Sequence, residues 1–144
     1  MADEPSTIRS LPSVVEMRFD VSLGARRFQV PAGTTFYEPD MAARALFFVH
    51  DGQVRIYPVI ATGCEPVLEV LSRGEWFGIE ALCRLQGFRY GTRAVAVTTA
   101  TVSEVPAARL LAVLPNHPQT ARELLGQMSS KLQRLWARGQ PHPR

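Results

Sequence analysis

Cysteine and lysine are scarce in this 144-residue sequence. Its two cysteines, Cys64 and Cys83, are too few for a disulfide framework or a metal-ligand set. We expect two free buried thiols, with a single disulfide as the alternative. Lys131 is the only lysine, so scattered arginines carry almost all of the net charge of +3. Scattered arginines favour an ordinary surface over a nucleic-acid interface.

Long apolar runs are absent as well. No run of the length that spans a bilayer occurs, and residues 1–5 are polar and acidic rather than the start of a signal peptide. The sequence therefore predicts no membrane association and favours a cytoplasmic location. Its length is that of one domain with a hydrophobic core.

Motifs that carry catalysis or metal binding are also missing. The sequence has no nucleophile elbow, no phosphate-binding Gly-Lys-Ser/Thr loop and no paired carboxylates in a recognisable arrangement. His50 stands alone beside a predicted turn, without a second histidine at metal-ligand spacing. We therefore expect neither an enzyme nor a metal site.

Short β-like segments, separated by glycine and proline turns, make up most of the chain. Residues 1–13 are polar and are expected to be a flexible lead-in. Asp51-Gly52 is the strongest hairpin signal, between an apolar segment and an alternating one. The predicted strands are 26–30, 34–37, 45–50, 53–57, 67–71, 93–97 and 100–105. Many short strands predict a β-barrel or jelly roll over 14–117.

The character of the chain changes after this region. Pro106 suits the first position of a short helix that the prolines at 115 and 118 end. The segment 118–138 is assigned to a longer helix, with its helical core at about 119–136. Residues 139–144 are expected to form a tail after this helix. Its apolar residues recur with heptad spacing: Ala121, Leu125, Met128, Leu132 and Leu135. This stripe favours a dimer interface, and packing on the barrel is the alternative.

The segment 73–97 carries the candidate binding chemistry. Gly74 and Gly78 flank an aromatic pair, a helical turn follows Gly78, and Arg93 begins an apolar strand. Glycines let the backbone approach a ligand, while a helix start and an arginine both attract anions. We interpret this segment as an anion-binding cassette.

Four blocks, taken in order, resemble the cyclic-nucleotide-binding sensor domain of the cyclic-AMP receptor protein/FNR superfamily. These blocks are 31–36, 45–57, 74–78 and 93–97, within a resemblance that covers about 30–136. The resemblance implies a mainly β fold with helices, in which a double-stranded β-helix, a cupin-like jelly-roll barrel, is followed by a long dimerisation helix. It also implies an allosteric homodimer that senses a small anionic effector in transcriptional regulation.

Carried over residue by residue, the resemblance keeps only part of the nucleotide chemistry. Arg93 falls where the family has its phosphate-binding arginine. Ile79 stands where the family has a ribose-binding glutamate, and Glu80 follows one residue later, about 100° further round a helical turn. Leu135 and Trp136 replace the hydroxyl residues that read adenine. The phosphate-type contact is therefore expected without the ribose and base contacts.

The cyanobacterial nitrogen regulators that sense 2-oxoglutarate, a branch of the same superfamily, resemble the chain in other features. They too have an aliphatic residue at the place of Ile79, and their ligand-gripping cation falls at Lys131. Two carboxylates need two cations, which Arg89 or Arg93 together with Lys131 would supply. Trp136 departs from this branch, which has an acidic residue there.

The expected effector is therefore a cyclic nucleotide or a 2-oxoglutarate-like dicarboxylate, with no other cofactor. The candidate ligand-binding residues are Phe77, Gly78, Ile79, Glu80, Arg89, Arg93, Ala94 and Lys131. The competing hypothesis is an interaction protein that binds no ligand and acts by dimerisation or by binding a partner protein.

The sequence ends at Arg144, a few residues past Trp136. That is too few for the helix-turn-helix that follows the dimer helix in these regulators. We expect no direct DNA binding by this chain alone, which is either the sensor part of a longer regulator or a separate sensor.

Overall fold

The computed structural model of the protein describes residues 24–58, 68–83 and 88–139. The predicted lead-in over 1–13, Cys64 and most of the predicted tail lie outside the described residues. Cys83 is partly buried and carries a free thiol.

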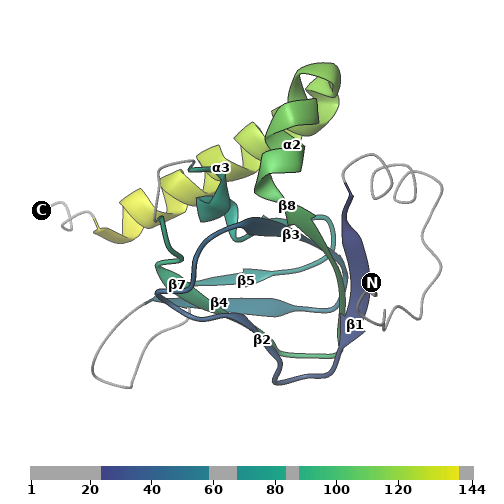
Figure 1. The fold of residues 1–144 in the computed structure, drawn as a ribbon. Coiled ribbons are helices and arrows are strands. Elements are labelled where there is room, and N and C mark those ends of the chain that lie inside the picture. The colour runs from purple at the N-terminus through teal and green to yellow at the C-terminus, as the bar shows by residue number, and fades with distance from the viewer. Residues whose placement is uncertain (1–23, 59–67, 84–87, 140–144) are drawn as a thin grey trace, which may run out of the picture.

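Two four-stranded antiparallel sheets form the barrel that the sequence predicts (Figure 1). The first sheet has the order β1 (Arg26–Val30), β8 (Ala100–Pro106), β3 (Ala45–Asp51) and β6 (Trp76–Phe77). The second has the order β2 (Thr35–Tyr37), β7 (Thr92–Ala96), β4 (Val54–Pro58) and β5 (Glu69–Leu71). Apart from β4 and β5, neighbouring strands in each sheet are not consecutive in sequence, so the chain passes repeatedly between the sheets, which is the topology of a jelly roll.

The Asp51-Gly52 turn does not form the hairpin that its sequence suggests. The strands on either side of it, β3 and β4, belong to different sheets and do not pair with each other. The turn instead lies against the start of β8, where a Cβ atom on Gly52 would come within 2.3 Å of the Thr99 carbonyl oxygen. The dipeptide therefore specifies a sharp turn, whereas strand pairing follows from burying one face of each sheet.

An aromatic core fills the space between the sheets. The rings of Phe47 and Phe77 are stacked with centroids 5.0 Å apart, and those of Tyr37 and Tyr90 are stacked at 3.8 Å. A second apolar cluster lies on the other side of β3 and β8. It joins the barrel to the helices through Leu46, Trp76, Ala81, Val105, Ala107, Leu110 and Leu124.

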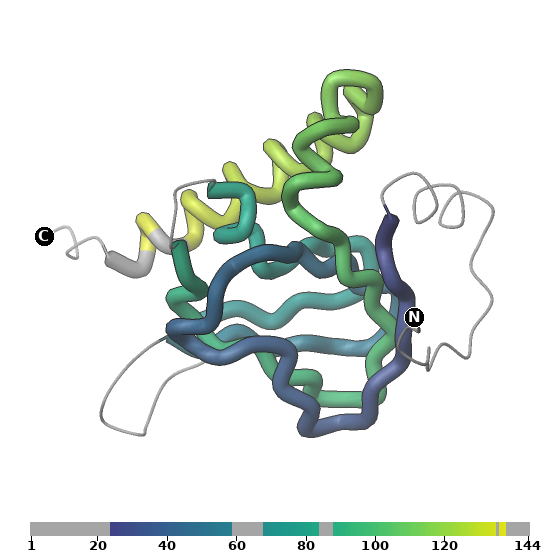
Figure 2. The backbone as a smooth tube through the Cα atoms, in the orientation of Figure 1, coloured from purple at the N-terminus to yellow at the C-terminus, as the bar shows by residue number. Residues whose placement is uncertain are grey.

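The helices gather on one side of the barrel (Figure 2). The short 3-10 helix η1 (Ile79–Leu82) precedes β7, and β8 leads into α2 (Ala107–Val113), η2 (Leu114–Asn116) and the 22-residue α3 (Pro118–Gly139). Pro106 is the last residue of β8 and precedes α2 directly. In the described part of the chain, no helix is both long and apolar enough to cross a membrane.

Two faces of α3 differ in exposure. Leu124 is 2% exposed and packs in the second apolar cluster, while Leu125, Leu132 and Trp136 are each at least 65% exposed. Of the predicted heptad stripe, Leu125 and Leu132 are thus exposed, Met128 is partly buried, and the side chain of Leu135 is not described. The helix therefore packs on the barrel and still presents an exposed apolar face, so the two alternatives drawn from the sequence are not exclusive.

Candidate functional site

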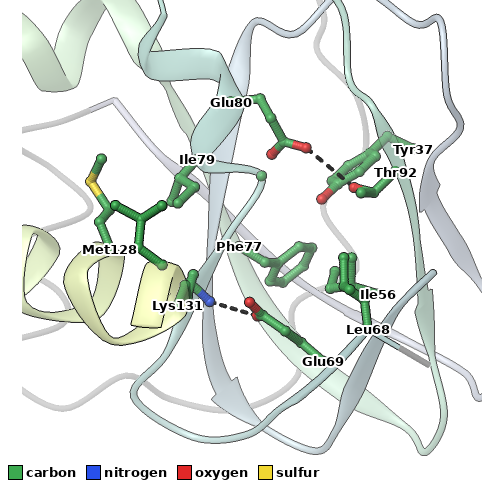
Figure 3. A pocket seen from close by; sticks show the side chains of 12 residues that line it. Tyr37, Ile56, Leu68, Glu69, Phe77, Ile79, Glu80, Thr92, Met128 and Lys131 are labelled. Carbon is green, nitrogen blue, oxygen red and sulfur yellow. Dashed lines mark hydrogen bonds and ion pairs between the residues drawn. The ribbon is translucent and has the colours of Figure 1, made fainter. Parts of the chain in front are cut away.

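A cavity of about 440 Å³ lies between the second sheet, the start of η1 and α3 (Figure 3). This volume falls in the range of small-molecule sites, which are largely apolar with a few polar groups. The apolar wall consists of Ile56, Leu68, Phe77, Ile79, Met128 and Leu132. The polar groups come from Tyr37, Glu69, Glu80, Thr92 and Lys131.

Gly78 sets the shape of one wall. Its φ is 72°, a left-handed conformation, and a Cβ atom there would lie 3.2 Å from the Phe47 ring and 3.3 Å from the Ala45 carbonyl oxygen. Only glycine accommodates both the conformation and the close packing. The chain therefore turns sharply at Gly78 into η1, and this turn brings Ile79 and Glu80 to the cavity.

A buried ion pair closes the side of the cavity nearest α3. The Lys131 Nζ lies 2.8 Å from the Glu69 Oε1, and the two side chains are only 10% and 11% exposed. Lys131 belongs to α3 and Glu69 to β5, so the pair joins the helix to the barrel (Figure 3). Charges removed from water attract each other strongly, and either one is costly to leave without its partner.

A hydrogen-bonded group of neutral and acidic side chains forms the opposite side. The Thr92 hydroxyl donates to the Glu80 carboxylate at 3.2 Å. Burial, and secondarily the negative charge of Glu80, raises the pKa of the Tyr37 phenol well above its ordinary value. Burial also raises the pKa of Tyr90, whose ring stacks on Tyr37, to about 12. Both phenols are therefore neutral near pH 7.

The charged residues that line the cavity are two carboxylates and one ammonium group. They are Glu69, Glu80 and Lys131, so the described lining carries one net negative charge. Because Glu69 already neutralises Lys131, an anion entering the cavity must compete with a carboxylate of the protein itself.

Five of the eight predicted site residues line the cavity: Phe77, Gly78, Ile79, Glu80 and Lys131. Glu80 does so although the one-residue offset was expected to turn its carboxylate away from the usual contact. The other three, Arg89, Arg93 and Ala94, are not among the residues that line it.

Strand alternation accounts for the position of Arg93. Successive side chains of a strand point to opposite faces. On β7, Ala94 is fully buried in the core and Thr92 lines the cavity, so Arg93 lies on the outer face. Its guanidinium carbon is 5.6 Å from the Tyr57 ring centroid. Arg93 is therefore not among the residues that line the described cavity, and its expected role in anion binding stays a prediction.

Arg89 is directed elsewhere too. Its side chain is exposed and donates a hydrogen bond to the Asp40 carbonyl oxygen at 2.5 Å. The two-cation arrangement expected for a dicarboxylate thus does not form among the described residues, because Lys131 is the only cation in the described lining.

Three polar lining residues escaped prediction: Tyr37, Glu69 and Thr92. The alternation along 92–96 was a usable signal for Thr92, because it places Thr92 on the same face as Ala94. For Glu69, no local pattern indicates that a strand residue will meet a lysine 62 positions later.

His50 contacts polar side chains away from the cavity. Its Nδ1 and Nε2 atoms lie 3.0 and 3.1 Å from Nη2 of Arg27. The Nε2 atom also lies 2.7 Å from the Ser103 hydroxyl oxygen. Within residues 24–58, 68–83 and 88–139, no three histidine, cysteine, aspartate or glutamate side chains come together as metal ligands.

The chain is similar in sequence to one protein family and in structure to several transcription regulators. The family model described as cyclic nucleotide-binding domain matches residues 27–117. The global regulator CLP of Xanthomonas campestris, whose structure is described as c-di-GMP responsive, superposes with a TM-score of 0.73 at 22% identity, over 83% of this chain and 58% of that chain. None of the curated proteins matches the sequence significantly.

Two further structures extend the comparison. The catabolite activator protein of Thermus thermophilus gives a TM-score of 0.70 at 25% identity, over 87% of this chain and 58% of that chain. The sensor domain of the transcriptional regulator DNR of Pseudomonas aeruginosa gives a TM-score of 0.63 at 22% identity, over 85% of this chain and 83% of that chain. The match thus spans less than two thirds of CLP and of the Thermus protein but most of the isolated DNR sensor domain.

The buried ion pair makes a quantitative prediction. Lys131→Met and Glu69→Gln should each lower the free energy of unfolding by about 3 kcal/mol, because each leaves one buried charge uncompensated. The double variant should lose clearly less than the sum. Urea denaturation at a fixed protein concentration measures all four proteins.

The exposed pair of Arg26 and Glu104, with side chains 59% and 30% exposed, supplies the control. Glu104→Gln should cost less than about 1 kcal/mol. Equal losses for Lys131→Met and Glu104→Gln would mean that the buried pair does not hold α3 to the barrel.

Proposed function

We propose that this chain, which belongs to the cyclic nucleotide-binding domain family, binds a small anionic effector in the cavity beside α3 and transmits its binding through paired α3 helices to the control of transcription in the cytoplasm. The observation that carries the proposal is the position of Lys131. One residue is at once part of the cavity wall and part of the helix with the exposed apolar face.

The effector acts by exchanging partners with Glu69. An anionic group that reaches the Lys131 ammonium replaces the Glu69 carboxylate, whose Oε1 lies 2.8 Å from the Lys131 Nζ. The contact between α3 and β5 is then lost, and a contact between α3 and the effector takes its place. Because the two states differ in what holds α3, effector binding shifts the position of the helix.

The charge of the cavity narrows the class of effector. A single cation, already balanced by Glu69, suits one negative charge rather than two. A cyclic mononucleotide, with its single phosphodiester charge, meets this requirement, and 2-oxoglutarate does not. The apolar wall accepts a flat organic body, and Glu80 accepts a hydrogen bond from an effector hydroxyl or amine.

The role in transcription rests on relatives. CLP is described as linking cell-cell signalling to virulence gene expression, and DNR is described as a transcriptional regulator. We propose that this chain contributes the sensing function to a regulator of the same kind.

A second candidate function is supported by the exposed face of α3. Leu125, Leu132 and Trp136 expose apolar surface along one side of the helix. The Lys131–Glu69 pair also satisfies the charge of the cavity lysine without a ligand. An interaction protein that dimerises or binds a partner protein through α3, with no effector, is consistent with both observations.

Effector binding is tested by thermal unfolding with cyclic AMP, cyclic GMP, cyclic di-GMP and 2-oxoglutarate as probes. A cyclic mononucleotide at about 100 times its Kd should raise the Tm of the wild-type protein by roughly 5–10 °C. Glu69→Gln/Lys131→Met should abolish the rise, because it removes the cation without leaving a buried charge unpaired. Glu69→Gln alone should enlarge it, because the competing carboxylate is gone.

Arg93→Ala is the matched control, because Arg93 lies outside the cavity and its loss should leave the shift intact. Effector sensing is excluded, and the interaction protein is favoured, if none of these probes raises the wild-type Tm and native mass spectrometry of the purified protein finds no bound small molecule.

Dimerisation through α3 is tested independently by light scattering after size-exclusion chromatography. The wild-type protein should be a dimer, and Leu125→Asp should be a monomer, because it places a charge on the exposed apolar face. Val70→Asp, which changes another half-exposed apolar residue on β5, should remain dimeric. A monomeric wild-type protein, or a dimer that tolerates Leu125→Asp, would exclude this interface.

A further inference from the structure

One glutamine fastens α3 to the strand that enters the cavity wall. The Gln127 Oε1 accepts a hydrogen bond from the Trp76 backbone N–H at 2.9 Å, and the Gln127 Nε2 donates to the Gly74 carbonyl oxygen at 3.0 Å. Both bonds are partly buried. In an antiparallel sheet, the backbone N–H and C=O groups of residues two apart bond to a neighbouring strand. Here the side chain of Gln127 makes both of these bonds instead.

The position of β6 explains why this contact matters. In the described sheet, β6 lies at the edge and pairs with β3 on one side only. The segment before it is also tied to β3, because the Gly74 N–H donates to the Val49 carbonyl oxygen at 2.8 Å. Gln127 thus occupies the free edge, directly before Phe77 and Gly78 enter the cavity wall.

Gln127 also has a defined place on the inner face of α3. It lies three residues after Leu124 and four before Lys131, the spacing that puts side chains on one helical face. Leu124 packs in the second apolar cluster, and Lys131 reaches the cavity. Apolar contact tolerates sliding, whereas two directed hydrogen bonds to fixed backbone atoms do not.

We infer that Gln127 is a positioning residue that couples the location of α3 to the shape of the cavity wall formed by Phe77, Gly78 and η1. A displacement of α3 at its exposed face pulls on the Gly74–Trp76 backbone and so moves the wall. By reciprocity, a ligand that fixes the wall fixes the helix. The inference rests on the proposed function for the meaning of the cavity and for the α3 face at which Leu125→Asp acts, but it needs no effector.

Amide hydrogen exchange tests the coupling in the absence of any ligand. The readout is the amide of Ala81, in η1, and that of Cys83, which caps the end of η1. They donate to the Gly78 and Glu80 carbonyl oxygens and not to Gln127. Leu125→Asp, on the exposed face of α3, should raise their exchange rates by about tenfold in the wild-type background. In a Gln127→Met background, the same change should raise them by less than about twofold.

Two variants control for a merely structural role. Gln133→Met makes the same substitution at an exposed position of α3 and should leave the tenfold response intact. Gln127→Glu keeps the acceptor for the Trp76 N–H and loses the donor to Gly74, so its response should be intermediate. If Gln127→Met fails to fold, Gln127→Glu serves in its place. A full tenfold rise in exchange rate on adding Leu125→Asp to Gln127→Glu would then overturn the inference.

Two further results overturn it: no response to Leu125→Asp in the wild-type background, or an equal response with Gln127→Met. No effector is present in this experiment. Nucleotide probes that leave the Tm unchanged, together with native mass spectrometry that finds no bound small molecule, would therefore refute effector binding and leave this result standing.

Discussion

The structure depends on one buried charge pair. Lys131 and Glu69 meet at 2.8 Å with side chains about one tenth exposed, between a helix and a strand that are distant in sequence. Such a pair contributes little net stability compared with apolar packing, but it penalises any arrangement that separates the charges. It therefore fixes where α3 lies on the barrel, and it places the only lysine of the chain in the wall of the cavity.

The position of α3 then determines both surfaces on which the proposed function relies. Its inner face contributes Leu124 to an apolar cluster, Gln127 to the edge of β6 and Lys131 to the cavity. Its outer face carries the exposed Leu125 and Trp136. Because both faces belong to one helix, a displacement of α3 would change both the cavity and the outer face.

Much of the fold could be predicted from the sequence, because its signals are local or follow a recognisable order. Turn glycines, short β-like segments and a terminal helix with heptad spacing indicated a jelly roll followed by a long helix, and the four blocks identified the family that the match over 27–117 confirms. The glycine at position 78 could be singled out as well, because its left-handed backbone conformation favours glycine, and it lines the cavity.

What could not be predicted is how side chains from distant segments meet. A shift of one residue along a strand exchanges the inner and outer faces. The resemblance gave a binding role to Arg93, whereas the neighbouring Thr92 lines the described cavity. The partner of Lys131 and the two backbone contacts of Gln127 arise from the packing of α3 on β5 and β6. No periodicity in the sequence encodes them.

Whether Glu69 holds Lys131 in the cavity wall can be measured at Lys131 itself, since no other lysine is present. Lysine-selective isotope labelling gives a single side-chain ammonium signal by nuclear magnetic resonance. If Glu69 holds Lys131 in the cavity wall, this signal is protected from rapid solvent exchange. In Glu69→Gln, its chemical shift changes and the protection is lost. A rapidly exchanging signal that Glu69→Gln leaves unchanged would show that Lys131 is not held in the cavity wall and would contradict the account.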